Sequence, residues 1–383
     1  MGTLRYLKNE KMKKILFVTG TRADFGKLEP LAKATIAAGY QVSFFVTGMH
    51  MMNKYGDTRW EVRVVEGAEI FEYVNQKEGD SLDSILSKTV VGFSDFVHEH
   101  RPDLVIIHGD RIEATAVSLV CATNYIHSAH IEGGEISGTI DESLRHCNSK
   151  LCSTHFVSSH EAADRVRSLG ESENRIYIIG SPELETHLND SGVKIEEVKN
   201  RYGITFENYA IVIFHPVTSE RSTMSAQVEN LYESLELSGK NFVVIAPNND
   251  PGSSEIFDVL GRLPEERFRI IPSMRFNYFS ELLKNSSLII GNSSVGVREA
   301  PFIGVPSIDI GTRQNKRAVN DSITHCNPHD SEKIKSLLSS DLWDKRFKPA
   351  TKFGEGKSST KFIEVLSTNE FWEHPAQKTF TDK

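Results

Sequence analysis

The sequence has little cysteine and no long apolar run. Its 383 residues include four cysteines, which lack the paired CxxC spacing of a metal site and are too few for a disulfide framework. Reduced thiols of this kind are typical of cytoplasmic proteins. The longest apolar runs are strand-sized, such as residues 104–107, whereas a membrane helix needs about 20 apolar residues. We therefore predict a cytoplasmic protein with no membrane partner.

The N-terminus also lacks the apolar region and the small-residue cleavage site of a signal peptide. Residues 1–14 are basic and polar, and they lead directly into the apolar residues 15–18. We interpret residues 1–11 as an extension or an alternative start before Met12.

Basic residues do not predominate. The chain has 44 lysines and arginines against 52 aspartates and glutamates, a net charge of −8, which disfavours nucleic acid as the main partner. A few local arginines and helix N-termini can still bind an anion. The shares of apolar residues (39%) and charged residues (25%) are ordinary for a globular protein. The length suits two domains of roughly 150 to 200 residues each.

Several cofactor and nucleophile motifs are missing. The loop at 20–26 has five residues between its glycines and continues into Leu28 after Lys27, so it is not a Walker phosphate loop. The GxGxxG fingerprint, the HExxH zinc motif and the GxSxG nucleophile elbow are absent as well. We therefore expect no nicotinamide cofactor, no catalytic metal and no acyl-enzyme.

Strand-like and helical segments alternate along both halves of the chain. β-Branched and aromatic runs predict strands at 14–19, 42–47, 104–108, 127–131, 155–157, 176–179, 209–214, 242–245, 268–271, 288–290 and 305–310. Helical periodicity in the first half predicts helices at 27–38, 84–99, 111–123 and 160–169.

This alternation predicts an α/β protein with two Rossmann-like, doubly wound domains that face a central cleft. We expect the first domain at 12–185, the second at 186–345, and a C-terminal tail at 346–383 that packs back on the first domain. Ligands of such folds bind at the carboxyl ends of the strands, so the chemistry should lie in residues just after strands.

The first strand is followed by a loop that carries an arginine and an aspartate. Arg22 and Asp24 stand at the N-terminus of the next helix, a place suited to holding an anion. A turn with a local ion pair is the structural alternative.

Three carboxylates follow later in the first half. Asp110 and its neighbour Arg111 end one strand, Glu132 ends the next, and Asp141 precedes a helix. Carboxylates from consecutive units suit proton transfers at a carbon atom, provided that their surroundings separate their pKa values. The structural alternatives are solvated loop residues and, for Asp141, a helix cap.

In the second half, two strand ends carry hydrogen-bonding residues. His215 follows the strand at 209–214 and can bind a phosphate or relay a proton, although a purely structural histidine is also possible. Asn249 follows the strand at 242–245, where amides can bind a base or a phosphate.

The strand at 288–290 runs through glycine and asparagine into two serines and a helix. Free amides, the helix dipole and the hydroxyls of Ser293 and Ser294 favour a diphosphate there. Glu299, in the first turns of the helix, is suited to a ribose diol or merely to offsetting the helix dipole. Arg313, after the next strand, adds positive charge for the phosphates.

The ordered set of these segments resembles the hydrolysing UDP-N-acetylglucosamine 2-epimerases of bacterial sialic acid synthesis. The matching segments are GTRAD at 20–24, TGMH at 47–50, HGDR at 108–111, HIEGGE at 130–135, GSP at 180–182, FHP at 214–216, PNND at 247–250, GNSS at 291–294 and GTR at 311–313. Each segment is weakly specific alone, whereas the ordered set is highly specific.

The resemblance implies a GT-B-like fold, no cofactor, a UDP-sugar substrate held mainly by the second domain, and a homodimer or homotetramer. It implies diphosphate contacts from Arg22, His215, Ser293, Ser294 and Arg313, ribose contacts from Glu299, and catalytic roles for Asp110, Glu132 and Asp141. The implied reaction eliminates UDP to give 2-acetamidoglucal, to which water then adds at C1 while a proton reaches C2 from the opposite face.

Other activities stay open at this point. A UDP-2,4-diacetamido-trideoxyhexose of the legionaminic acid pathway is an alternative substrate, and a non-hydrolysing epimerase returns UDP to the sugar. A glycosyltransferase would need a separate acceptor, and a silent nucleotide-binding module would not need three carboxylates.

Overall fold

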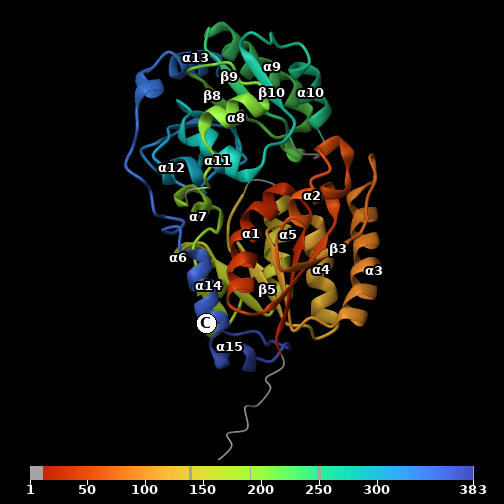
Figure 1. Ribbon diagram of the computed structural model, residues 1–383. Helices are drawn as coiled ribbons and strands as arrows, with labels where there is room; N and C mark the ends of the chain where they lie inside the picture. Colours follow the sequence, from red (N-terminus) through yellow and green to blue (C-terminus); the bar gives the residue numbers. More distant parts are fainter. Residues whose placement is uncertain (1–11, 138–139, 190, 248–251, 383) are drawn as a thin grey trace, which may run out of the picture.

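The computed structural model describes residues 12–137, 140–189, 191–247 and 252–382. Two parallel β-sheets with helices on both faces form two domains, one above the other in Figure 1. The predicted α/β class with two Rossmann-like domains is confirmed. Residues 1–11, which we interpret as an extension, lie outside the described residues.

The first sheet has the strand order β3-β2-β1-β4-β5-β6-β7. Apart from the edge strands β3 and β7, its strands are mainly buried apolar segments, as parallel sheets covered by helices on both faces require. The bounds are β1 (Lys14–Thr19), β2 (Gln41–Val46), β3 (Ala68–Glu72), β4 (Leu104–His108), β5 (Ser128–Ile131), β6 (Thr154–Val157) and β7 (Ile176–Ile178).

The second sheet has the order β10-β9-β8-β11-β12-β13. Every pairing given for it is parallel. The bounds are β8 (Ala210–Ile213), β9 (Phe242–Ile245), β10 (Phe268–Ile271), β11 (Ile289–Gly291), β12 (Ser307–Ile310) and β13 (Ile323–Cys326).

Helices cover both faces of each sheet. Those of the first domain are α1 (Arg22–Ala37), η1 (Gly48–Met51), η2 (Asn53–Tyr55), α2 (Arg59–Arg63), α3 (Leu82–His100), α4 (Ile112–Thr123), α5 (Ile140–Leu151), α6 (His160–Ser168) and η3 (Glu173–Arg175). The others are α7 (Glu183–Leu188), α8 (Ile195–Tyr202), η4 (Thr218–Thr223), α9 (Met224–Leu237), α10 (Ser253–Leu260), α11 (Phe276–Lys284), η5 (Ser294–Gly296), α12 (Glu299–Phe302), α13 (Ser331–Leu338), η6 (Asp341–Asp344), α14 (Ser358–Leu366) and α15 (Asn369–Glu373).

The strands that the sequence predicts are present, with ends shifted by no more than two residues. Two strands were missed, β3 and β13, and both are edge strands. Most of their residues are only partly buried, so charged and polar side chains interrupt the apolar run on which the prediction depends.

The first helix begins earlier than predicted, at Arg22 rather than near residue 27. Thr21 and Asp24 form a capping box, in which the Thr21 hydroxyl accepts from the Asp24 amide at 3.2 Å and the Asp24 carboxylate accepts from the Thr21 amide at 3.0 Å. Arg22 and Asp24 therefore belong to the first turn of α1 and have fixed positions.

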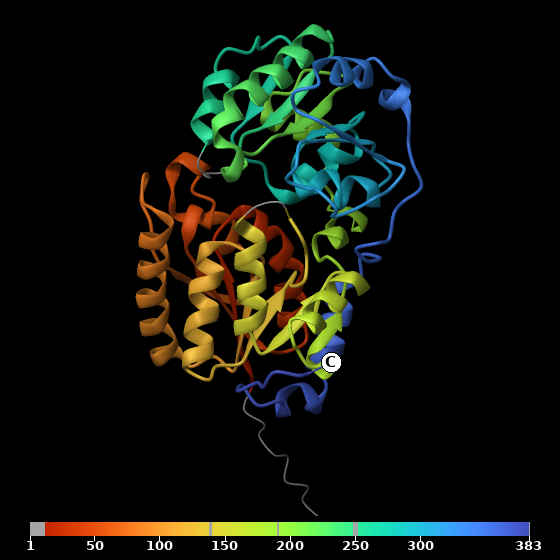
Figure 2. The same ribbon diagram turned by 180° about the vertical axis from the view of Figure 1, so that it is seen from behind.

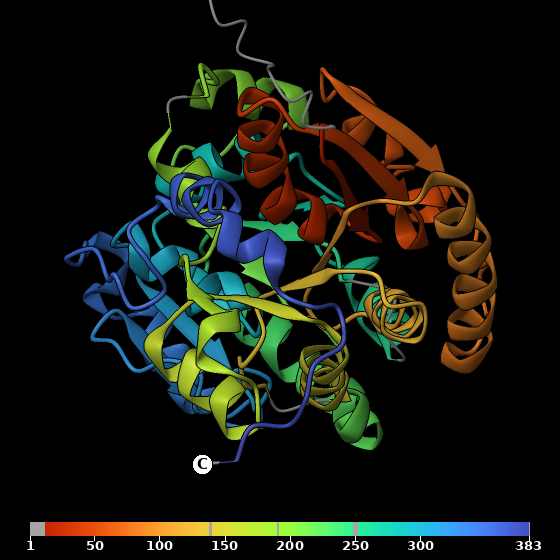
Figure 3. The same ribbon diagram turned by 90° about the horizontal axis from the view of Figure 1, so that it is seen from below.

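The C-terminal segment crosses from the second domain to the first. Figure 2 shows this blue segment descending along one side of the molecule, and Figure 3 shows it below the first sheet. Helix α14 packs on α1, and Phe362, Leu366 and Phe371 share a core with Phe156 of β6. The first domain therefore contains side chains from both ends of the chain.

Candidate active site

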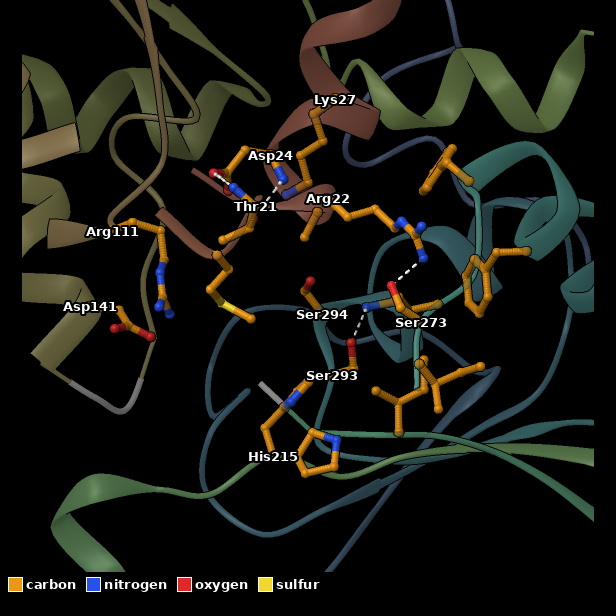
Figure 4. A pocket seen from close by; sticks show the side chains of 18 of the residues that line it. Thr21, Arg22, Asp24, Lys27, Arg111, Asp141, His215, Ser273, Ser293 and Ser294 are labelled. Carbon is orange, nitrogen blue, oxygen red and sulfur yellow. Dashed lines mark hydrogen bonds between the residues drawn. The ribbon is translucent and has the colours of Figure 1, made fainter. Parts of the chain in front are cut away.

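A cleft lies between the two domains, at the carboxyl ends of their strands (Figure 4). It has a volume of about 330 Å³. The predicted site residues that line it are Arg22, Asp24, Asp110, Arg111, Glu132, Asp141, His215, Ser293, Ser294, Glu299 and Arg313. Asn249 lies outside the described residues.

The second-domain wall is built on a glycine turn after β11. Gly291 has a φ of 136°, and a Cβ there would lie 2.0 Å from the carbonyl oxygen of Ile213. Only glycine lets the chain turn this close to β8. The turn leads into Ser293, whose hydroxyl accepts from the Val295 amide at 3.4 Å, and Ser294. Figure 4 shows both serine side chains at the cavity.

Asn292 connects the ends of β8 and β11. Its side-chain oxygen accepts from the amide of His215 at 2.7 Å, and its side-chain nitrogen donates to the His215 carbonyl at 2.7 Å. Its own carbonyl accepts from Gln314 at 2.9 Å and from Arg313 at 3.3 Å. Asn292, for which we predicted no role of its own, thus fixes His215 and Arg313 relative to the serine turn.

Glu299 is the first residue of α12 and is buried. The Nε2 atom of His187 lies 3.3 Å from its Oε1 atom, and the Nδ1 atom of the same ring lies 2.9 Å from the hydroxyl of Ser280. His187 therefore holds the carboxylate in place. Sequence reasoning missed it, because its segment in α7 is short and carries mostly polar residues.

Beside these polar groups, the second-domain wall is apolar. A surface of this kind suits an uncharged ring better than a second anionic group. It consists of Ile213, Ile245, Ala246, Pro247, Pro272, Met274, Phe276, Phe279 and Val295.

Arg22 reaches across the cleft from the first domain. Its guanidinium forms an ion pair with Glu61, with Nε 3.0 Å from Oε2, and donates to the hydroxyl of Ser273 in the second domain. Figure 4 shows the contact with Ser273. The ion pair of Arg22 is therefore not the local one named as the structural alternative, because its partner is distant in sequence.

Asp24 is held by main-chain amides. Its Oδ2 atom accepts from the amides of Gly20 at 3.1 Å and Thr21 at 3.0 Å. Burial alone would raise the pKa of Asp24, but the nearby His108 ring and the charge of Arg111 lower it below its ordinary value. Asp24 is therefore an ionised cap of α1 at the edge of the cleft.

Glu132 is the centre of a buried ion cluster. Its Oε2 atom lies 2.7 Å from Lys27 Nζ and 2.8 Å from His108 Nε2, and its Oε1 atom accepts from Arg298 and, at 2.6 Å, from Arg317. Burial alone would raise the pKa of Glu132, but the positive charges of Arg298 and Lys27 and the contact with His108 lower it well below its ordinary value. Lys27 and His108 belong to the first domain, whereas Arg298 and Arg317 belong to the second.

The other two predicted carboxylates are less enclosed. Asp110 forms an ion pair with Arg145 of α5, which also donates to the carbonyl of Glu135 at 3.1 Å. Asp141 lies 3.9 Å from Arg313 across the cleft. The side chains of Asp110 and Asp141 are each 22% exposed, against 6% for Glu132. They are therefore more open to a ligand than Glu132 is.

Arg111 precedes α4 and faces the same cavity, near Asp141 in Figure 4. Among the described residues, no group of three or more His, Cys, Asp and Glu side chains is placed to hold a metal ion. Within the described ranges, no helix is long and apolar enough to cross a membrane.

Two Rossmann-like domains that face one cleft define a GT-B-like protein. The family described as UDP-N-acetylglucosamine 2-epimerase matches residues 33–367. A UDP-N-acetylglucosamine 2-epimerase of Neisseria meningitidis serogroup B is 42% identical over 375 residues, covering 97% of this chain and 99% of that protein. The chain belongs to the UDP-N-acetylglucosamine 2-epimerase family.

Two further similarities concern the reaction and the fold. A Legionella pneumophila protein named UDP-N,N'-diacetylbacillosamine 2-epimerase (hydrolyzing) is 29% identical, covering 93% of this chain and 96% of that protein. The crystal structure of Methanocaldococcus jannaschii UDP-GlcNAc 2-epimerase, in complex with UDP-GlcNAc and UDP, matches with a TM-score of 0.78 at 20% identity, covering 92% of this chain and 99% of that one. At this identity the structural match concerns the fold alone.

Proposed function

We propose that this protein is a hydrolysing UDP-N-acetylglucosamine 2-epimerase, which converts UDP-N-acetylglucosamine and water to UDP and N-acetylmannosamine, the first step of sialic acid biosynthesis. The observation that carries the proposal is the pairing of two unlike walls across one cleft. Asp110 and Asp141 stand on the first-domain wall, and Ser293, Ser294 and Arg313 stand on the second.

The second wall would hold UDP. The hydroxyls of Ser293 and Ser294 and the guanidinium of Arg313 are suited to a diphosphate, because charge-assisted hydrogen bonds to phosphate oxygens are among the strongest in proteins. His215, held by Asn292, would donate to the same group. The apolar residues beside them would cover the uracil ring, and Glu299 would accept from the ribose hydroxyls.

Arg22 and Arg111, on the first wall, would neutralise charge on the departing diphosphate. The N-acetylglucosamine ring would then lie between the diphosphate and the carboxylates of Asp110 and Asp141. We also propose Asn249 and Asp24 as residues at the edge of the bound substrate.

The first wall would carry the chemistry. The C2–H bond is only weakly acidic, so its proton leaves together with UDP through a transition state that is positively charged at C1. Carboxylates near C1 stabilise that charge, while arginines stabilise the leaving diphosphate. The product is 2-acetamidoglucal with a C1=C2 double bond. Water then adds to C1, and a proton returns to C2 on the face opposite to the one it left.

The names of the relatives support two substrates to different degrees. The 42% identical relative is named for UDP-N-acetylglucosamine, and the 29% identical relative for UDP-N,N'-diacetylbacillosamine. We therefore favour UDP-N-acetylglucosamine and keep the diacetamido sugar as the second candidate. The word "hydrolyzing" in the second name, with the HIEGGE segment at 130–135, favours release of a free sugar over a non-hydrolysing reaction.

Incubation with UDP-N-acetylglucosamine in deuterated water, followed by proton NMR, tests this proposal. We expect UDP and free N-acetylmannosamine with deuterium at C2. A mixture of intact UDP-sugars would instead identify the non-hydrolysing reaction. No turnover of UDP-N-acetylglucosamine, with turnover of UDP-N,N'-diacetylbacillosamine, would identify the second candidate substrate.

We further propose domains at 12–185 and 186–345, with the tail at 346–383, in a cytoplasmic homodimer or homotetramer. Light scattering of the purified protein measures the mass of the assembly, and a monomeric mass at micromolar concentration would contradict the oligomer.

A further inference from the structure

His108 ends β4, two residues before Asp110, and borders the cleft. In the parallel register of β4 and β5 it pairs with Ile131, so Glu132 follows directly beside it. The His108 side chain is 7% exposed, and its Nε2 atom lies 2.8 Å from Glu132 Oε2. The strand register thus makes a histidine–carboxylate pair at the edge of the cleft.

Among the residues that the structure describes, the second ring nitrogen of His108 has no hydrogen-bond partner. Within the described part of the chain, nothing accepts from or donates to Nδ1, which is buried. Asp24 Oδ1, at 3.8 Å, is too far for a hydrogen bond. A buried polar atom of this kind is costly unless something pairs with it. A histidine with one nitrogen on a carboxylate and the other unpaired at a cleft is the usual arrangement of a general acid or base.

The charges around His108 favour its protonated form. Burial and the charge on Lys27 oppose protonation, yet the carboxylates of Asp24 and Glu132 outweigh both and raise the pKa of His108 above its ordinary value. Arg111 also lies near Asp24. The imidazolium therefore carries a proton that it can donate. After it has done so, the neutral ring is still oriented by Glu132.

Glu132 is poorly suited to the same task. Both of its oxygens already bind cationic side chains, including Lys27, Arg298 and Arg317. These charges keep Glu132 ionised, so it has no proton to donate. Its carboxylate oxygens are already engaged in ion pairs, so it is also a poor proton acceptor. The sequence assigned Glu132 a catalytic role, whereas the contacts favour the role of a counter-ion.

We propose that His108 is the acid that returns the proton to C2 of the 2-acetamidoglucal, and that Glu132 is the positioning residue that orients and charges it. This inference rests on the proposed function. In this step the electron pair of the C1=C2 bond takes the Nδ1 proton to form C2–H, and water forms the new C1–O bond. The second proton of that water passes to a carboxylate, for which Asp110 and Asp141 are placed, and the neutral His108 regains a proton from solvent.

The test separates the second half of the reaction from the first. Synthetic 2-acetamidoglucal and UDP are given to the wild type, to His108→Gln and to His127→Gln. The glutamine at 108 retains a donor toward Glu132 but no transferable proton. His127 precedes the opposite end of β5 and lies outside the cleft lining, so its variant is a matched control.

We expect His108→Gln to hydrate the glucal about 100- to 10,000-fold more slowly, the usual contribution of a general acid. With UDP-N-acetylglucosamine it should release UDP together with free 2-acetamidoglucal, which the control does not. The hydration rate of the wild type should fall as the pH rises through the pKa of His108, and this decline should be missing from the variant.

The outcomes that contradict the role of His108 alone are distinguishable from the outcome that contradicts the proposed function. A His108→Gln variant that hydrates the glucal at the control rate, or that loses UDP release and hydration to the same degree, overturns the role of His108 alone. A wild type that does not hydrate the glucal overturns the proposed function together with it. Thermal unfolding and UDP affinity of the variant show whether it is folded, and a folded variant with unchanged pH dependence also counts against His108.

Discussion

The two walls of the cleft hold their polar groups in different ways. On the first-domain wall, the side chains are charged and engage one another, as Glu132 does with Lys27 and His108. On the second-domain wall, hydroxyls and main-chain groups predominate beside an apolar surface, and Asn292 fixes their positions through neutral hydrogen bonds. Neutral hydrogen-bond donors can bind and release a ligand at little electrostatic cost. A charged cluster instead maintains the protonation states of the side chains within it.

The comparison assigns UDP binding to the second wall and proton transfer to the first. Substitutions of the carboxylates on the first wall should therefore change turnover without changing UDP affinity. Substitutions on the second wall should change UDP affinity. The predictions below test this separation, from the largest expected effect to the smallest.

Asp110→Asn should lower kcat by about 1,000-fold, because the charge that stabilises the positive C1 is lost. The affinity for UDP should stay within about twofold, since the residue lies on the first wall. Steady-state kinetics and calorimetric titration with UDP measure the two quantities. Parallel loss of UDP binding would show that Asp110 acts mainly on the structure of the cleft.

Arg298→Met should destabilise the fold by about 3–5 kcal/mol, because it removes one of the two cations, Arg298 and Lys27, that both Glu132 and Glu183 contact in the buried cluster. Urea unfolding measures the change in the free energy of unfolding. The control is Arg262→Met, whose exposed pair with Glu229 should contribute no more than about 1 kcal/mol. Equal effects of the two substitutions would mean that the buried cluster adds nothing specific.

Acid should weaken the first domain before the second. Burial lowers the pKa of His50 from 6.5 to about 4 and that of His130 to about 3. A lowered pKa means that the unfolded chain takes up protons that the fold does not, so this contribution is complete above about pH 6.5 and is lost as the pH falls toward 4.

Hydrogen exchange measures the protection of the amides in each sheet as the pH falls through that window. Amides of β1 to β7 should lose protection first, after correction for the intrinsic pH dependence of exchange. His50→Gln should reduce the difference, since it removes a titrating group. Simultaneous loss in both sheets would contradict the prediction.

Ser294→Ala should weaken UDP binding by roughly tenfold, because a hydrogen bond to a charged phosphate oxygen contributes about 1.5–3 kcal/mol. The limiting rate at saturating substrate should change little. Ser254→Ala, on the outer helix α10, is the matched control. A fall in kcat with unchanged UDP affinity would place Ser294 in the chemical step instead.

Much of this arrangement could be predicted from the sequence. Asp110, Glu132 and Ser293 follow apolar strands directly, and the ends of parallel strands meet at one edge of a sheet. What the sequence could not supply were the partners of these residues. Glu132 is bound by Arg298 and Arg317, which are more than 160 positions away and belong to the other domain.

One signal for these partners was available. Arg298 stands between buried apolar residues at 297 and 300, and an arginine within such a run indicates a buried ion pair. His187 gave no comparable signal, because its segment carries mixed polar residues of ordinary loop composition. Edge strands β3 and β13 were missed for a related reason, since half-exposed strands lack a continuous apolar pattern.

A turnover in water labelled with ¹⁸O tests the central claim most directly, because it shows which bond the protein breaks. Elimination of UDP followed by hydration predicts that the label appears on C1 of the released N-acetylmannosamine and is absent from UDP. Label in the terminal phosphate of UDP would mean that water attacks phosphorus, and it would contradict the assignment of the chemistry to the first wall of the cleft.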